Sequence, residues 1–181
     1  MRFKGAVFRA HHPGWAFAPL SGAGAALHGG RFNPRGTEAL YTSLSVEGAW
    51  TEAQQAFPFK AQPATICAYD VDCADVEDLT DPAVRARWDL APADLACAWE
   101  DLAHRGLEPP SWAAARRMRA AGVAAVHVPS FASAAPPGTA NLVFWRWGDA
   151  LPHRVRVIDD LARLPRDRAS WDGAGEPKVR P

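Results

Sequence analysis

Alternation of apolar and polar positions predicts strands near both ends of the chain, with helical spacing between them. We expect strands at Gly5–Ala10, Ala39–Ser43, Thr65–Val71, Val123–Val128, Asn141–Trp147 and Arg154–Ile158. The stretch from Pro19 to Gly30 is rich in small residues and has no period, so it is predicted to be a loop.

Helical periodicity follows the second strand and then dominates the middle of the chain. A helix is predicted from Ser45, whose hydroxyl suits an N-cap, to Phe57 before Pro58. Three further helices are predicted at Pro82–Trp88, Ala93–Arg105 and Ser111–Ala121. Strands, then helices, then strands indicate an α+β fold. We expect one domain over residues 1–164 and an irregular tail over 165–181.

Composition narrows the classes of function. The chain of 181 residues carries 20 basic and 20 acidic side chains, so it has no net positive field for binding nucleic acid or an anionic membrane. It has no signal-like or membrane-spanning apolar segment, and a cytoplasmic location is expected. Its six histidines and three cysteines lack the spacing of metal ligands, so no metal is expected.

Two segments carry candidate binding residues. In Gly29–Pro34, Arg31 follows two glycines, where the backbone allows close approach and the guanidinium is free to hold an anion such as a diphosphate. Taken alone, this segment favours the reading of Arg31 as a surface residue after a flexible turn. In the strand Ala39–Ser43, alternation places Ala39, Tyr41 and Ser43 on one face, and Tyr41 could pack on a flat ring or belong to the core.

The helix that follows carries a carboxylate on an otherwise small and apolar stripe. Glu52 shares this stripe with Ser45, Ala49 and Ala56. It either turns to solvent or is half-buried, and burial requires a partner such as Arg31 or the hydroxyls of a substrate. Ser130 and Asn141 flank the Ala132–Ala140 loop at predicted strand ends, where small polar groups commonly orient ligands or simply form turns.

The order of these segments resembles the RES domain, a family named for its Arg, Glu and Ser. The matching segments are Gly-Gly-Arg-Phe-Asn-Pro at 29–34, Ala-Leu-Tyr-Thr-Ser at 39–43, the helical Glu52, Val-Pro-Ser at 128–130 and Asn-Leu-Val-Phe at 141–144. Phe32 stands where the family usually has tryptophan, which preserves an aromatic ring. The resemblance covers roughly Val7 to Ile158, and the helical middle matches loosely.

This resemblance implies a mono-ADP-ribosyltransferase-like fold, with a split mixed β-core flanked by helices and a cleft for NAD⁺. It implies an enzyme that breaks the nicotinamide–ribose bond. Arg31 would hold the diphosphate or the neighbouring ribose, Tyr41 would pack on the nicotinamide side, and Glu52 would serve the reacting ribose. Ser130 would orient the ligand, and Asn141 is a further candidate. Such proteins are typically toxins that arrest growth, and each is paired with a helix-turn-helix antitoxin of the Xre type.

The acceptor of the ADP-ribosyl group stays open at this point, because water, phosphate or a cellular protein can each take the activated ribose. Two other readings also remain. The chain could be a non-catalytic protein-binding module that uses its tryptophans and its tail. It could also be a metal-independent enzyme of another class acting on nucleotides, such as a nuclease, although no basic groove accompanies Arg31 and Glu52.

Overall fold

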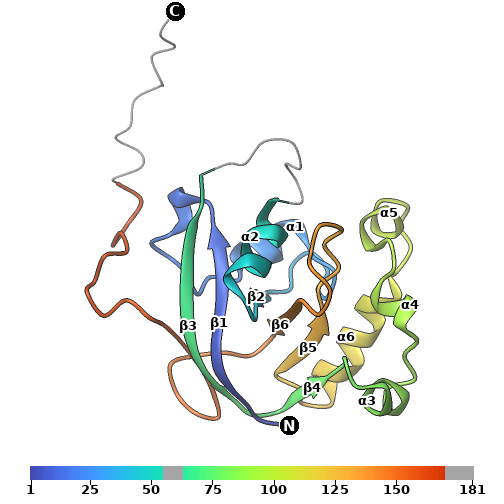
Figure 1. Ribbon diagram of the computed structural model, residues 1–181. Coiled ribbons are helices and arrows are strands. Elements are labelled where there is room, and N and C mark those ends of the chain that lie inside the picture. The colour runs from blue at the N-terminus through green and yellow to red at the C-terminus, as the bar shows by residue number, and fades with distance from the viewer. Residues whose placement is uncertain (55–62, 170–181) are drawn as a thin grey trace, which may run out of the picture.

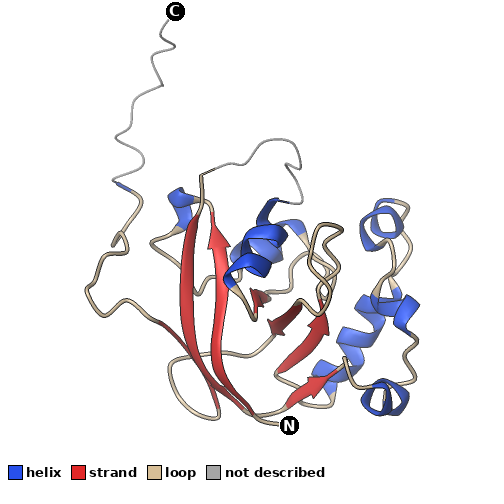
Figure 2. Cartoon of the chain, in the orientation of Figure 1, coloured by secondary structure: helices blue, strands red, loops and turns tan. Residues whose placement is uncertain are grey.

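The computed structural model describes residues 1–54 and 63–169, where strands alternate with short helices (Figures 1 and 2). The strands are β1 (Phe3–His11), β2 (Leu40–Ser43), β3 (Thr65–Cys73), β4 (Val76–Asp78), β5 (Ala125–Pro129), β6 (Ala140–Phe144) and β7 (His153–Val157). The helices are η1 (Pro13–Trp15), α1 (Ala23–His28), α2 (Val46–Gln54), α3 (Pro82–Arg87), α4 (Pro92–Leu95), α5 (Trp99–His104) and α6 (Pro110–Ala120).

The strands form one mixed sheet in the order β4-β5-β6-β2-β1-β3-β7. Strands β4 and β5 run parallel, and the other neighbours are antiparallel. Helices α3 to α6 gather beside β4 and β5, whereas α2 lies over β1 (Figure 1). The predicted α+β class, with a mixed sheet flanked by helices, is confirmed.

Strands β1 and β2, neighbours in the middle of the sheet, separate from each other. Strand β1 pairs with β3 along its whole length, from Phe3 opposite Cys73 to His11 opposite Thr65. It pairs with β2 only where Phe8 lies opposite Ser43. Beyond that position the backbones diverge, so the sheet is split along its middle, as the family resemblance implies.

Both faces of the sheet are buried at strand β6. Along β6, Leu142 and Phe144 belong to a cluster with Val7 and Tyr69, whereas Val143 belongs to a cluster with Met118 of α6 on the opposite face. Side chains of α3, α4 and α6 complete this second cluster, so these helices cover one half of the sheet.

The predicted loop from Pro19 to Gly30 is partly wrong, because residues 23–28 form α1. Its small side chains form no apolar stripe that would reveal a helix. Contacts from other segments hold the helix in place. Asn33 donates from Nδ2 to the carbonyl of Ala25 at 2.8 Å. The indole of Trp147 packs so closely on Gly22 that an added Cβ would lie 2.8 Å from it. Such tertiary contacts leave no periodic signal in the local sequence.

The single helix predicted at Ala93–Arg105 is also wrong, because the chain forms α4 and α5 with a break between them. At the break, the carbonyls of Leu95 and Cys97 accept hydrogen bonds from Arg31, at 3.1 and 2.6 Å. In a continuous helix the amide of Trp99 would bond to the carbonyl of Leu95. Here it bonds to the carbonyl of Cys97. The three-residue strand β4 was not predicted, and it is too short to show alternation.

The start of α2 agrees with the sequence. The hydroxyl of Ser45 accepts a hydrogen bond from the amide of Gly48 at 3.0 Å, which confirms Ser45 as the N-cap. The predicted helix end at Phe57 and the position of Ala56 lie outside the described residues, as does the predicted tail beyond Ala169. Within the described ranges, no helix is both long and apolar enough to cross a membrane.

Buried hydrogen-bonded polar groups support the end of β1 at His11, where the strand has separated from β2. His11 Nε2 lies 2.7 Å from the hydroxyl of Tyr69, which donates to the carbonyl of Pro19 at 2.8 Å. A neutral imidazole with its proton on Nε2 satisfies both bonds. Burial, together with the positive charge of Arg9, lowers the pKa of His11 from 6.5 to about 4.

This depressed pKa predicts a pH-dependent stability. Between about pH 6.5 and pH 4 the unfolded chain binds a proton at His11 that the folded protein excludes, so stability is lost as the pH falls through this window. We expect His11 to lower the free energy of unfolding by up to roughly 3 kcal/mol over that range. Urea unfolding of wild type and His11→Gln at several pH values checks this. The exposed His28→Gln should keep the wild-type profile, and a similar profile for His11→Gln would contradict the prediction.

Candidate active site

Glu52 is the centre of a small hydrogen-bonded group formed by three distant segments. Its Oε1 atom accepts hydrogen bonds from the hydroxyl of Ser130 and from Nδ2 of Asn141, each at 2.6 Å. Ser130 follows the end of β5, and Asn141 lies on β6. The structure therefore brings together three residues that the sequence singled out separately. These two donors hold the half-buried carboxylate. The sequence had offered Arg31 as one expected partner.

Ser43 controls the direction of the Asn141 amide and was missed as a site residue. Its buried hydroxyl donates to Oδ1 of Asn141 at 2.5 Å. With its oxygen bound in this way, the amide must present its nitrogen to Glu52. Ser43 shares a strand face with Tyr41, and this alternation was the one signal in the sequence that could have identified it.

A close approach of α2 to the sheet places Glu52 there. Gly48 and Ala49 are the buried residues of this helix. A Cβ added to Gly48 would lie 2.9 Å from the methyl group of Thr139 and 3.2 Å from Cβ of Ser43. Only glycine permits this helix–sheet distance, and the next turn of the helix then brings Glu52 over β6.

A cavity of about 370 Å³ lies in the split between β1 and β2. Glu52 and Asn141 line one side of it, and Arg9 lines it from β1. Gly24 and Ala25 of α1 also border the cavity, as do Gly29 and Gly30. Its walls are thus largely backbone and small side chains, with one carboxylate and one guanidinium group.

Arg9 is the second functional candidate that the sequence did not reveal. Its Nη1 atom donates to the carbonyls of Ser21 at 2.9 Å and of Pro19 at 3.4 Å. No carboxylate bonds to this guanidinium within the described part of the chain, and burial lowers its pKa. A desolvated cation without an ionic partner favours binding of an anion. Alternation with the buried Val7 could have shown that this arginine points inward.

Arg31 lies on the other side of Glu52, and its guanidinium is not free as the sequence suggested. Nη1 donates to the carbonyls of Leu95 and Cys97, and the group lies 4.5 Å from the ring centre of Phe131. Burial lowers its pKa, while the charge of Glu52 is among the influences that favour the cationic form. Arg31 therefore joins the helical middle to the site and keeps its charge near Glu52.

A second cavity, of about 500 Å³, opens beside Arg31. It shares Tyr41, Glu52, Ala53 and Asn141 with the cavity in the split, so Glu52 borders both spaces. Its other walls are mostly aromatic and aliphatic and come from Phe32, Trp99, Val128, Phe131 and Val143, with Glu100 at the edge.

The hydroxyl of Tyr41 is committed to the structure. It donates to Oδ1 of Asn33 at 2.7 Å and accepts the amide of Phe32 at 2.9 Å. Burial raises the pKa of Tyr41, so the phenol stays neutral. Its ring, bordering both cavities, can pack on a ligand, but the hydroxyl is not available to transfer a proton.

Two indoles hold the segment that carries Arg31. Trp112 donates to the carbonyl of Gly30 at 2.7 Å, and Trp145 donates to that of Phe32 at 3.0 Å. The side chain of Asn33 also donates to the carbonyl of Thr37 at 2.8 Å. These bonds satisfy the polar groups of an irregular loop and give Arg31 a defined position.

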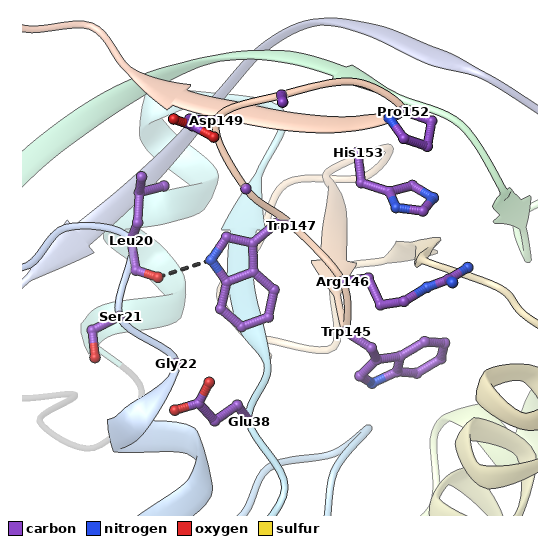
Figure 3. A pocket seen from close by; sticks show the side chains of 12 residues that line it. Leu20, Ser21, Gly22, Glu38, Trp145, Arg146, Trp147, Asp149, Pro152 and His153 are labelled. Carbon is purple, nitrogen blue, oxygen red and sulfur yellow. Dashed lines mark hydrogen bonds between the residues drawn. The ribbon is translucent and has the colours of Figure 1, made fainter.

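Another hollow, of about 600 Å³, lies elsewhere (Figure 3). Its lining includes the carboxylates of Glu38 and Asp149, and it shares no residue with the cavities at Glu52. Trp147 donates to the carbonyl of Leu20 at 3.0 Å on this side, whereas Arg9 bonds to the next carbonyl, that of Ser21.

Across residues 1–54 and 63–169, no three His, Cys, Asp or Glu side chains form a group that could hold a metal ion.

Comparison with known proteins identifies a family and a similar fold. The model of the RES domain family matches residues 6–167. A chain in the crystal structure of the M. tuberculosis MbcT–MbcA toxin–antitoxin complex has a similar fold, with a TM-score of 0.61 and 22% sequence identity. The match covers 88% of this chain and 84% of that chain. Comparison with curated proteins gave no match.

Removal of the Tyr41 hydroxyl tests the frame of the site. In Tyr41→Phe the buried amide of Phe32 and Oδ1 of Asn33 both lose a partner. We expect the free energy of unfolding, measured with urea, to fall by about 1–3 kcal/mol. Ser133→Ala, which removes an exposed hydroxyl, should change it by less than about 0.5 kcal/mol. Equal stability of Tyr41→Phe and wild type would show that these bonds are not needed.

Proposed function

Since the chain belongs to the RES domain family, we propose that it is the NAD⁺-consuming toxin of a toxin–antitoxin pair. The proposed reaction breaks the bond between the ribose C1′ and the nicotinamide nitrogen of NAD⁺. The ADP-ribosyl group then passes to water, to phosphate or to a cellular protein. The observation that carries the proposal is the oriented carboxylate of Glu52 between two cavities, one of which is lined by an arginine that bonds to no carboxylate of residues 1–54 and 63–169.

The chemistry of this bond suits one carboxylate. Both bonding electrons leave with nicotinamide, which departs as a neutral molecule and needs no proton. The ribose becomes an oxocarbenium-like cation, and a negative charge near its hydroxyl groups stabilises that state. Ser130 and Asn141 hold Glu52 in place before substrate arrives, so little reorganisation is required as charge develops.

The arginines receive separate roles in this proposal. Arg9 binds the diphosphate, because it lines the split and its hydrogen-bond partners among the described residues are backbone carbonyls. Arg31 remains near the reacting ribose, one of the two positions that the resemblance implies for it. Tyr41 packs with its ring on the nicotinamide side, and Ser130 and Asn141 orient Glu52 and the ligand.

The partner in this proposal is a helix-turn-helix antitoxin of the Xre type. Family membership supports it, and the fold is shared with a chain of a solved toxin–antitoxin complex. An antitoxin must keep NAD⁺ from Glu52 while it is bound, because free enzyme would deplete the dinucleotide or modify protein in the cell that makes it.

The carboxylate is tested with Glu52→Gln, whose amide oxygen can still accept both hydrogen bonds. Nicotinamide release from NAD⁺, followed by mass spectrometry, should fall in kcat by about a hundredfold or more with little change in KM. Expression of wild type should arrest growth, whereas Glu52→Gln should not.

The products of the same assay identify the acceptor: ADP-ribose indicates water, its phosphate ester indicates phosphate, and a labelled protein in cell extract indicates a protein target. A Glu52→Gln protein that releases nicotinamide at the wild-type rate would contradict the role of Glu52. Wild type that releases none would contradict the proposed reaction.

Arg9 is tested with Arg9→Gln and Arg9→Lys. Loss of charge-assisted hydrogen bonds to the diphosphate should raise KM for NAD⁺ by about tenfold or more in the glutamine variant. Lysine should recover part of this loss, since it keeps the charge without the planar fork. Arg119→Gln, which removes an exposed arginine of α6, is the control and should match wild type. Unchanged KM in Arg9→Gln would exclude Arg9 from substrate binding.

A further inference from the structure

Three successive backbone carbonyls, those of Pro19, Leu20 and Ser21, accept hydrogen bonds from side chains of distant segments. Arg9 on β1 donates from Nη1 to the carbonyl of Ser21 at 2.9 Å and to that of Pro19 at 3.4 Å. The carbonyl between them, that of Leu20, accepts a hydrogen bond from Nε1 of Trp147 at 3.0 Å (Figure 3). The three residues lie in neither a helix nor a strand, so side-chain donors set the direction of their carbonyls.

The ring of Trp147 also contacts the backbone that leads into α1. A Cβ added to Gly22, the N-cap of this helix, would lie 2.8 Å from Cη2 of the indole. Two residues of the same helix, Gly24 and Ala25, border the cavity in the split. Trp147 lines the hollow of Figure 3 and not this cavity. The indole therefore supports the wall of the cavity from behind and does not face its interior.

The way in which Arg9 is bonded leaves one edge of its guanidinium for an anion. Both of its hydrogen bonds to the described residues use Nη1, so Nε and Nη2 are available. These two atoms form the planar edge that can bind two phosphate oxygens at once. A long side chain loses much rotamer freedom when it binds, so holding the guanidinium in advance favours affinity. The carbonyl of Ser21 provides this hold, and Trp147 fixes the peptide beside it.

We infer that Trp147 is a positioning residue for the anion-binding guanidinium of Arg9, an inference that rests on the proposed function. Its N–H fixes the carbonyl of Leu20, and its ring fixes the backbone at Gly22, so the carbonyl of Ser21 between them is directed at Arg9. This role concerns binding of the diphosphate and not cleavage of the nicotinamide bond. Loss of the indole should therefore raise KM for NAD⁺ and preserve kcat.

The inference is tested with Trp147→Phe, which removes the N–H and keeps an aromatic ring. KM for NAD⁺ should rise by about fivefold, the effect of one hydrogen bond on an equilibrium, and kcat should stay within about twofold. In the Arg9→Gln background the same change should alter KM by less than about twofold, because no guanidinium remains to be positioned. Trp88→Phe is the matched control and should match wild type. Its half-buried indole packs on the other core cluster, and its N–H has no hydrogen bond to the described residues.

A second variant displaces the indole from the opposite side. The backbone at Gly22 has φ −89° and ψ −1°, which alanine can adopt, but the new Cβ would force the ring of Trp147 to move. Gly22→Ala should therefore raise KM in the same way as Trp147→Phe. Gly148→Ala is its control, because Gly148 follows Trp147 directly and a Cβ there has no atom within 4 Å. Urea unfolding verifies that each variant is folded under the assay conditions.

A calorimetric titration with ADP-ribose, which has the diphosphate but no nicotinamide, measures binding without turnover. Trp147→Phe and Gly22→Ala should each weaken its Kd by about fivefold, and the two controls should not. Unchanged KM and Kd in both variants, with KM raised in Arg9→Gln, would overturn the inference and leave the proposed function standing. An equal effect of Trp147→Phe in both backgrounds would also overturn it, since the indole would then act without Arg9. Weakened ADP-ribose binding in a wild type that releases no nicotinamide would overturn the proposed reaction and retain the positioning role.

Discussion

The separation of β1 from β2 is the constraint on which the rest of the site depends. Because these strands pair only where Phe8 lies opposite Ser43, the split opens between them in the middle of the sheet, beside strand β6, which is buried on both faces. Each strand is held firmly by its other neighbour, β1 by β3 and β2 by β6. The split is therefore a rigid feature of the backbone, and polar side chains that point into it keep defined positions.

Buried polar groups around the split are arranged in satisfied sets. Ser43 fixes the amide of Asn141, and that amide and Ser130 hold Glu52. On the opposite side, the hydroxyl of Tyr41 satisfies two groups of the loop that carries Arg31. An unpartnered group in such a place costs about 1–3 kcal/mol, so each set resists rearrangement. The same organisation that stabilises the fold gives the carboxylate a single orientation.

Several parts of this arrangement could be predicted from local sequence. Strand periods located six of the seven described strands, and the Ser45 cap located the start of α2. Glu52 was identified because a carboxylate interrupted a small, apolar stripe. The helix α1 and the break between α4 and α5 were not predicted, since partners far along the chain contact them, namely Trp147 at the start of α1 and Arg31 at the break. The short strand β4 carried no period.

The sequence by itself determined the α+β class, the family, and the set of Arg31, Tyr41, Glu52, Ser130 and Asn141 as residues of interest. Which of them meet, and through which atoms, was decided by the tertiary structure. It brought Ser130 and Asn141 to one oxygen of Glu52, bonded Arg31 to the helical middle, and placed Arg9 in the lining of the split. The physical reason is that local periodicity reports which face of an element is buried, whereas hydrogen-bond partners depend on strand order and on how far apart two strands lie.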